Sequence, residues 1–336
     1  MAMRHSQLKE EAALFGPGRS LVGIVADPPP ALRRHSHPAV IVLNSGIVHR
    51  VGPGRIYVRI ARELAERGFV TMRFDFSGIG DSMARQDALP FKKSAICETQ
   101  NAMEYLRRTR GIDRFICLGG CSGAQVSLDA AGCDPRIIGG ILINFQAAEA
   151  GDAESQDAES QPDIITRRAA SYYWDRALGD RKSWYRFLTG QSDYRKLIRA
   201  LQYRLRRRLA PPARTRETSP LEADLQRLAQ RNVQMAFLCS EGDPLLDDLR
   251  DAGGAVLEQL HTSGKIALEI IPRSDHTFSS RDDQRRLLAV VVERVGTIST
   301  VQMPTSRDEL LLSYRGAIPG GAASMGRFVK EVSDEY

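Results

Sequence analysis

The sequence predicts an α/β fold with a mainly parallel sheet, helices on both faces and an inserted helical lid. Short apolar runs typical of strands alternate with segments whose apolar residues recur at helical spacing. Several runs are continuous rather than alternating, as expected of strands covered on both faces. The rhythm stops after Phe145 and returns only beyond residue 220, which indicates an insertion within one sheet domain.

Length and composition limit the class of protein. The 336 residues allow one large domain with an insertion, or two domains, and 42% hydrophobic residues fit a well-filled core. With no run of 18 apolar residues and no evident secretory signal, we expect a cytoplasmic protein without a membrane span. The five cysteines form no C-x-x-C pair, which favours reduced thiols. No metal or other cofactor is expected, because metal-ligand spacing is lacking and no G-x-G-x-x-G opens a helix.

The elements of the first half follow from their patterns. Residues 1–19 are polar and are expected to be loosely held. Strands are predicted at 20–26, 38–43 and 69–74, and helices at 55–68 and 94–110. The turn after the third strand is interpreted as structural rather than catalytic; its notable residues are Asp75, Gly78, Gly80, Asp81 and Ser82.

A strand, an abrupt turn and a helix are predicted within residues 115–131, around the sequence Gly-Gly-Cys-Ser-Gly-Ala. This layout is that of a nucleophile elbow, G-x-Nuc-x-G, in which small residues let neighbouring chain pass closely. Gly119 and Gly123 then make Cys121 the projecting residue. Shifted by one position, the same stretch reads G-x-S-x-A with Ser122 as nucleophile, and a glycine-rich turn with a buried cysteine is the plainest alternative.

The second half supplies two further polar groups just after predicted strands. Strands are predicted at 136–144, 233–239 and 266–271, with helical segments ending at Leu260 and spanning 282–295. Asp243 follows the strand at 233–239, and His276 follows the strand at 266–271. We therefore divide the chain into a first core part (1–148), a basic helical lid (149–220), a second core part (221–300) and a tail (301–336).

The predicted lid has an unusual charge. Residues 163–216 hold 15 Lys or Arg against four Asp or Glu, a net +11 that leaves −5 for the rest of a +6 chain. Trp174 and Trp184, the two tryptophans of the chain, also lie there and are expected to contact substrate. A positive field of this kind attracts anionic partners, although many of these arginines must simply face water.

Cys121, Asp243 and His276 occur in the chain order of the catalytic triad of α/β-hydrolases. The chain resembles that superfamily over residues 20–145 and 225–296, through VIVLNSG, VTMRFDFSGIGDS, LGGCSGA, LCSEGDP and SDHTF. The second motif is similar to lysophospholipase-like and serine-aminopeptidase-like members, and the cysteine elbow to dienelactone hydrolases and polyhydroxyalkanoate synthases. CSGA, with GIVHRVGPGR before it and an Arg/Trp-rich lid after it, most resembles the hydrolases associated with exosortase systems.

The resemblance implies a role for each residue. Cys121 would be the nucleophile, His276 its base and Asp243 the acid that orients the imidazole, with Asp247, Asp248 and Asp275 as competing acids. The backbone N–H groups of Ser122 and Ile47 would form the oxyanion hole. His49 is expected near the substrate, and Asn44-Ser45 replaces the His-Gly of many relatives. Cys117 and Cys239 are interpreted as inert core thiols.

The function that these features favour is acyl transfer through a Cys121 thioester, by hydrolysis of an ester, thioester or amide or by transfer to a second acceptor. The basic lid suggests an acyl donor carried on coenzyme A or on an acidic carrier protein. The alternative is a catalytically silent binding or scaffold protein of the same fold. A nucleic-acid partner is disfavoured, because no recognition motif accompanies the charge. The sequence predicts no oligomeric state.

Overall fold

The computed structural model describes residues 8–34, 36–147, 218–241 and 243–300. Its centre is an eight-stranded sheet in the order β1-β2-β4-β3-β5-β6-β7-β8. The strands are β1 (Lys9–Phe15), β2 (Leu21–Asp27), β3 (Ala39–Leu43), β4 (Thr71–Phe74), β5 (Phe115–Gly120), β6 (Ile137–Ile143), β7 (Gln234–Ser240) and β8 (Ile266–Ile271). The division into core and lid stays a prediction, because nearly all of the predicted lid, and the whole tail, lie outside the described residues.

Strand direction brings the candidate site together. The strands from β4 across to β8 are parallel, whereas β2 pairs antiparallel with both β1 and β4. The carboxyl ends of β3, β5, β6, β7 and β8 therefore meet at one edge of the sheet, the edge where α/β proteins usually place their sites.

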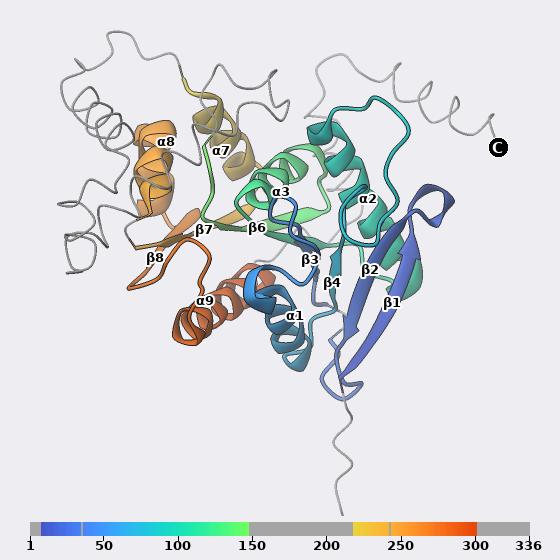
Figure 1. Ribbon diagram of the computed structural model, residues 1–336. Coiled ribbons are helices and arrows are strands. Elements are labelled where there is room, and N and C mark those ends of the chain that lie inside the picture. The colour runs from blue at the N-terminus through green and yellow to red at the C-terminus, as the bar shows by residue number, and fades with distance from the viewer. Residues whose placement is uncertain (1–7, 35, 148–217, 242, 301–336) are drawn as a thin grey trace, which may run out of the picture.

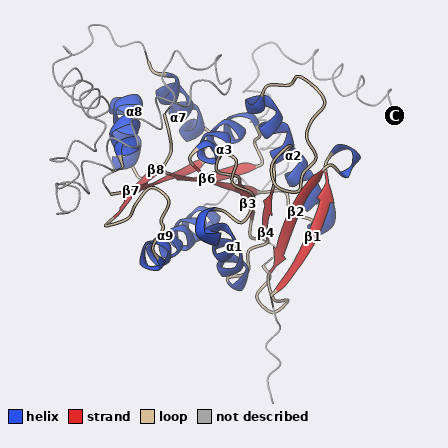
Figure 2. Ribbon diagram, in the orientation of Figure 1, coloured by secondary structure: helices blue, strands red, loops and turns tan. Residues whose placement is uncertain are grey.

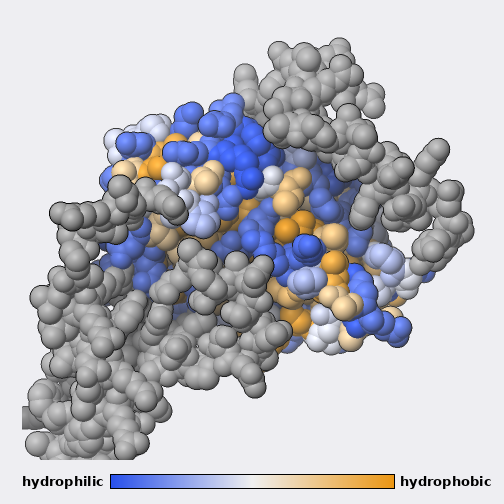
Figure 3. Space-filling model, turned by 90° about the horizontal axis from the view of Figure 1, so that it is seen from above, coloured by the Kyte–Doolittle hydropathy of each residue, from blue (hydrophilic) through white to orange (hydrophobic). Residues whose placement is uncertain are grey.

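Helices cover both faces of the sheet (Figures 1 and 2). One layer holds α1 (Ile56–Glu66) and α9 (Arg281–Thr300); the other holds α2 (Phe91–Arg110), α3 (Ser122–Cys133), α7 (Pro220–Gln230) and α8 (Pro244–Thr262). Short 3₁₀ helices span Pro17–Arg19 and Pro53–Arg55. Seen from the side of the second layer, the described surface is largely hydrophilic, with apolar side chains in separate patches between the polar ones (Figure 3).

Burial on both faces explains the continuous apolar runs. In β3, Ile41 and Leu43 belong to the core beneath α2, α3, α7 and α8, while Val40 and Val42 belong to the core beneath α1 and α9. All four side chains are at most 1% exposed. Every position of such a strand must therefore be apolar, and the predicted α/β architecture is confirmed.

The prediction that residues 1–19 are loosely held is wrong for β1. This strand pairs along its whole length with β2, from Lys9 opposite Asp27 to Phe15 opposite Leu21. Ala13 and Phe15 are buried. Its first residues are charged because β1 is an edge strand, and an edge strand with charged side chains resists pairing with other chains. That charge obscured the strand in the sequence.

Helix α7 was not predicted, although its start carries a recognisable signal. The Ser219 hydroxyl accepts a hydrogen bond from the Glu222 N–H (3.1 Å), and the Glu222 carboxylate accepts one from the Ser219 N–H (3.0 Å). This reciprocal pair is a capping box, with Pro220 at the first helical position. Within the described ranges, none of the helices combines the length and the apolar character that crossing a membrane requires.

Candidate active site

The elbow lies between β5 and α3, and its strained residue is Cys121. Cys121 has φ 55° and ψ −118°, a conformation that L-residues rarely adopt, whereas Ser122 is already the first residue of α3. A Cβ on Gly119 would lie 2.3 Å from the Gly123 carbonyl carbon, and a Cβ on Gly123 would lie 2.3 Å from the Asn44 oxygen. Both glycines are therefore required by close backbone contact, and the residue at the centre of this turn is Cys121.

The side-chain hydroxyls of Tyr57 and Ser45 form a hydrogen-bonded clasp around Gly120, the residue before Cys121. The Gly120 N–H donates to the Tyr57 hydroxyl (3.0 Å), and the Ser45 hydroxyl donates to the Gly120 carbonyl (3.0 Å). Tyr57 and Ser45 are also hydrogen-bonded to each other. β3 ends at Leu43, opposite Gly119, so these side chains complete the pairing that the strand no longer supplies. Burial raises the pKa of the Tyr57 hydroxyl. No sequence pattern indicated a role for this residue.

Asp243 and His276 are in direct contact. The Asp243 Oδ2 atom lies 2.5 Å from His276 Nδ1, and the Asp243 side chain is 4% exposed against 28% for His276. The other carboxylate oxygen accepts from the Leu245 N–H (3.1 Å), because Asp243 is the N-cap of α8. Asp247, one of the competing acids, is exposed.

Asp275, next to the histidine, hydrogen-bonds residues of its own turn. Its carboxylate accepts hydrogen bonds from the N–H of Thr277 (2.9 Å) and of Ser279 (3.1 Å), and from both hydroxyls. Burial acts to raise its pKa, but these hydrogen bonds outweigh it and the pKa is lowered. Asp275 thus fixes the loop that carries His276.

Asn144, which follows β6 directly, supports the same loop and was also missed. Its side chain bonds both the His276 carbonyl and Ser240 at the end of β7. In the sequence, an asparagine after a buried strand looks like an ordinary turn residue. No local pattern indicates that its side chain holds a distant loop.

The loop after β3 reaches the elbow through Gly46. The Gly46 N–H donates to the Ser122 hydroxyl at 2.7 Å. The Ile47 side chain is 91% exposed, and His49 is exposed as well. The amide that contacts Ser122 is therefore that of Gly46, one residue before the predicted oxyanion donor Ile47.

An ion-pair cluster behind this loop gives the turn after β4 a structural role. The Asp75 carboxylate is fully buried and pairs with the Arg50 guanidinium, which also bonds Asp81. Asn44 donates to Asp75 (3.2 Å) and accepts from the Phe76 N–H (2.8 Å). Burial acts to lower the pKa of Arg50, but its hydrogen bonds to Asp81 and Asp75 raise it. These contacts agree with the structural interpretation of the turn.

The remaining predicted residues fall away from the site or outside the structure. Cys117 and Cys239 are buried. Burial raises the pKa of both thiols, that of Cys239 to about 12, which disfavours the reactive thiolate. Trp174 and Trp184 lie outside the described residues. In the described ranges, no group of three or more His, Cys, Asp or Glu side chains is arranged to hold a metal ion.

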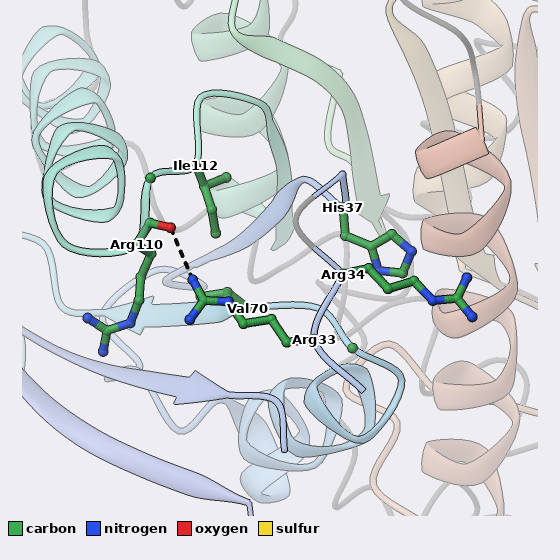
Figure 4. Close-up of a pocket in the computed structure, with 8 residues that line it drawn as sticks. Arg33, Arg34, His37, Val70, Arg110 and Ile112 are labelled. Atoms are coloured by element: carbon green, nitrogen blue, oxygen red, sulfur yellow. Dashed lines mark hydrogen bonds between the residues drawn. The ribbon is translucent and has the colours of Figure 1, made fainter. Parts of the chain in front are cut away.

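A small pocket lies at the opposite edge of the sheet, by the amino ends of β3, β4 and β5 (Figure 4). Arg33 donates to the Arg110 carbonyl at 3.0 Å. The Arg110 guanidinium points away from the pocket, toward Asp27, and Arg34 points away on the other side. The charges do not converge, and none of the predicted site residues lines this pocket.

The comparisons with known proteins agree on the fold. The structure superposes on dienelactone hydrolase from Anabaena variabilis (TM-score 0.51, 14% identity, covering 87% of this chain and 98% of that one). It also superposes on proline iminopeptidase from Mycobacterium smegmatis (TM-score 0.50, 16% identity, 87% and 99%) and on a hypothetical protein from Pseudomonas aeruginosa (TM-score 0.51, 13% identity, 88% and 96%). No protein-family model matches the sequence, and no curated protein sequence matches it significantly. With its sheet order and elbow, the chain has the α/β-hydrolase fold.

Proposed function

We propose that this protein is an acyl-transfer enzyme, a hydrolase or acyltransferase with a Cys121–His276–Asp243 triad. The observation that carries the proposal is the contact between Asp243 and His276, on the sheet edge where the strained Cys121 also lies. A buried carboxylate bonded to Nδ1 fixes the imidazole tautomer and stabilises its charged form. Among relatives, the lysophospholipase-like and serine-aminopeptidase-like branch, and within it the hydrolases of exosortase systems, fits the motifs best.

In the proposed first step, His276 accepts the proton of the Cys121 thiol. Because Nδ1 is engaged by Asp243, this transfer falls to Nε2. The thiolate then forms a bond to the acyl carbon, and the carbonyl π electrons move onto oxygen. When the tetrahedral species collapses, the bond to the leaving group breaks and the imidazolium gives that group its proton. The product is an acyl thioester on Cys121.

The oxyanion of the tetrahedral species requires two N–H donors. The Ser122 N–H is one, as the residue after the nucleophile. For the second donor we weigh Ile47, which the sequence favours, against Gly46, and the contact between Gly46 and the Ser122 hydroxyl supports Gly46.

The second step decides between hydrolysis and transfer. Water, or an acceptor alcohol, amine or thiol, gives a proton to His276 and attacks the thioester carbon, and Cys121 leaves and is reprotonated. The structural likeness to a dienelactone hydrolase supports hydrolysis. Thioesters react readily with amines and thiols, so transfer is the matching alternative.

Rapid mixing with p-nitrophenyl acetate, followed by peptide mass spectrometry, tests the proposal. We expect a stoichiometric burst of p-nitrophenolate and one acetyl group on the peptide that contains Cys121. Cys121→Ala should abolish both, at a cost of several orders of magnitude in rate. Ser122→Ala should keep substantial activity, because the proposal uses only the Ser122 N–H.

Two outcomes would contradict the proposal. An active Cys121→Ala with an inactive Ser122→Ala would make Ser122 the nucleophile. The absence of any burst or adduct, here and with a panel of acyl thioesters, would favour the catalytically silent binding protein.

A further inference from the structure

Asn144 is a buried amide in an unusual backbone conformation. It is 2% exposed and has φ 45°, in the left-handed region that asparagine tolerates better than most residues. It follows β6 directly, and β6 lies between the elbow strand β5 and the acid strand β7. Asn144 therefore stands between the two halves of the proposed triad.

Every polar atom of the Asn144 side chain has a partner. Nδ2 donates to the His276 carbonyl (2.7 Å) and to the Ser240 hydroxyl (2.8 Å), while Oδ1 accepts from the Ser240 N–H (2.8 Å). The Ser240 hydroxyl lies 3.0 Å from both Asn144 Oδ1 and the Asp275 carbonyl. Because Oδ1 already accepts from the Ser240 N–H, we assign the single hydroxyl hydrogen to the Asp275 carbonyl. Two consecutive carbonyls of the histidine loop, those of Asp275 and His276, are thus tied to β6 and β7.

The residue before Asn144 contacts the elbow. The Ile143 carbonyl accepts from the Cys121 N–H at 2.9 Å, and the Asn144 N–H donates to the Leu238 carbonyl at 2.8 Å. Two adjacent residues therefore link the backbone of Cys121 to the backbone of His276. Asp243, the N-cap of α8, holds the imidazole ring itself, whereas this link runs through the backbone of the histidine loop.

We propose that Asn144 is a positioning residue that sets His276 relative to Cys121, an inference that rests on the proposed triad. Without the amide, the ring keeps its bond to Asp243, but the loop loses the bond that fixes its place against β6. The backbone of His276 can then move with the loop, which turns the ring about its bond to Asp243 and away from the thiol. Displacement of a reacting group by about 1 Å costs roughly a hundredfold in rate.

The substitution Asn144→Gly tests this role. Glycine adopts φ 45° without strain, so the variant removes the amide without adding backbone strain. Asn232→Gly is the matched control, because Asn232 has φ 57°, is exposed and lies at the other edge of the sheet, before β7. His276→Ala is the reference for complete loss of the base.

The measurement is the rate of Cys121 alkylation by iodoacetamide as a function of pH, resolved by peptide mass spectrometry. A thiol paired with an imidazole reacts at lower pH than an ordinary thiol. For the folded population, we expect Asn144→Gly to move the profile toward higher pH, in the direction of His276→Ala, and to slow acetylation by p-nitrophenyl acetate about tenfold to a hundredfold. Asn232→Gly should overlay the wild-type profile.

If the Asn144 amide only stabilises the fold, Asn144→Gly should be less stable, but its folded molecules should keep the wild-type pH profile of Cys121 alkylation. That result would overturn the inference and leave the proposed triad standing. If His276→Ala itself leaves the profile unchanged, the proposed triad fails instead. Should Asn144→Gly not fold, Ser240→Ala provides the test, since it removes the hydroxyl that joins Asn144 to the Asp275 carbonyl. A smaller shift in the same direction supports the inference, and a profile that overlays wild type overturns it.

Discussion

The elbow and the histidine loop meet at one edge of the sheet but are held in place by different means. At the elbow, backbone atoms approach so closely that Gly119 and Gly123 admit no side chain. At the histidine loop, side-chain amides and hydroxyls from other strands bond the backbone, through Asn144 and Ser240. The first region is fixed by steric exclusion, and the second by hydrogen bonds over long sequence separations.

This difference predicts different consequences of substitution. A side chain added at the elbow must displace backbone, so it should be felt throughout the fold. A polar group removed from the histidine loop should leave the fold largely standing and affect the chemistry.

The largest effect should come from substitutions in the His276–Asp243 pair, and it should appear in the reaction rate and not in the stability. His276→Ala should slow acetylation by p-nitrophenyl acetate nearly as much as Cys121→Ala, about ten-thousandfold or more, because members of one catalytic unit are not additive. Asp243→Asn should be milder but still large. Burst kinetics and thermal unfolding are measured together, and the melting temperature of His276→Ala should stay near that of wild type. A crippling effect of Asp247→Asn or Asp248→Asn instead would show that the acid is misassigned.

The next effect should come from the elbow, on stability. Gly123→Ala places a Cβ 2.3 Å from the Asn44 oxygen, which is backbone and cannot rotate away. We expect a loss of about 3 kcal/mol or more in the free energy of unfolding, measured by denaturant titration. The control is Gly132→Ala in the same helix, whose Cβ would meet only the end of the Arg227 side chain at 3.2 Å. Equal stability of the two variants would remove the steric account of the elbow.

Tyr57→Phe tests how much hydrogen bonding, as opposed to steric exclusion, contributes to the elbow. It keeps the buried ring but leaves the Gly120 N–H without its side-chain acceptor, at an expected cost of about 1–3 kcal/mol in the free energy of unfolding. The comparison variant is Tyr105→Phe, since Tyr105 packs its ring against Phe15 away from the elbow. If the two substitutions cost the same, the clasp contributes nothing particular to the elbow.

The smallest effect concerns the basic segment, which lies outside the described residues. Its net +11 over residues 163–216 should attract anionic acyl donors, and salt should screen that attraction. We expect kcat/KM to fall several-fold from low to high salt for an acyl-coenzyme A and to stay level for a neutral ester of the same acyl group. Changing the arginines to Gln should flatten the first slope; these are Arg204, Arg206, Arg207 and Arg208. Equal slopes for both substrates would leave the segment an ordinary basic surface.

The contrast between the two regions also explains what the sequence could predict. The elbow could be predicted because close approach demands glycines at fixed spacing, and Asp243 and His276 were proposed as site residues because each lies in the loop after a strand. Asn144 and Tyr57 were missed, since their partners are distant in the chain and no local pattern records a long-range hydrogen bond. β1 was missed because an edge strand carries charge. The capping box of α7, in contrast, was readable from Ser219 and Glu222.

In the protein without substrate, the Ser122 hydroxyl accepts the Gly46 N–H that the substrate oxygen would take in the proposed reaction. In the proposed reaction, with Gly46 as donor, a substrate carbonyl must displace that hydroxyl, so one neutral hydrogen bond is exchanged for another and ground-state binding gains little. Once the oxygen carries a full charge, the same amide makes a stronger, charge-assisted bond. The exchange therefore favours the transition state over the bound substrate, which is the condition for accelerating the chemical step.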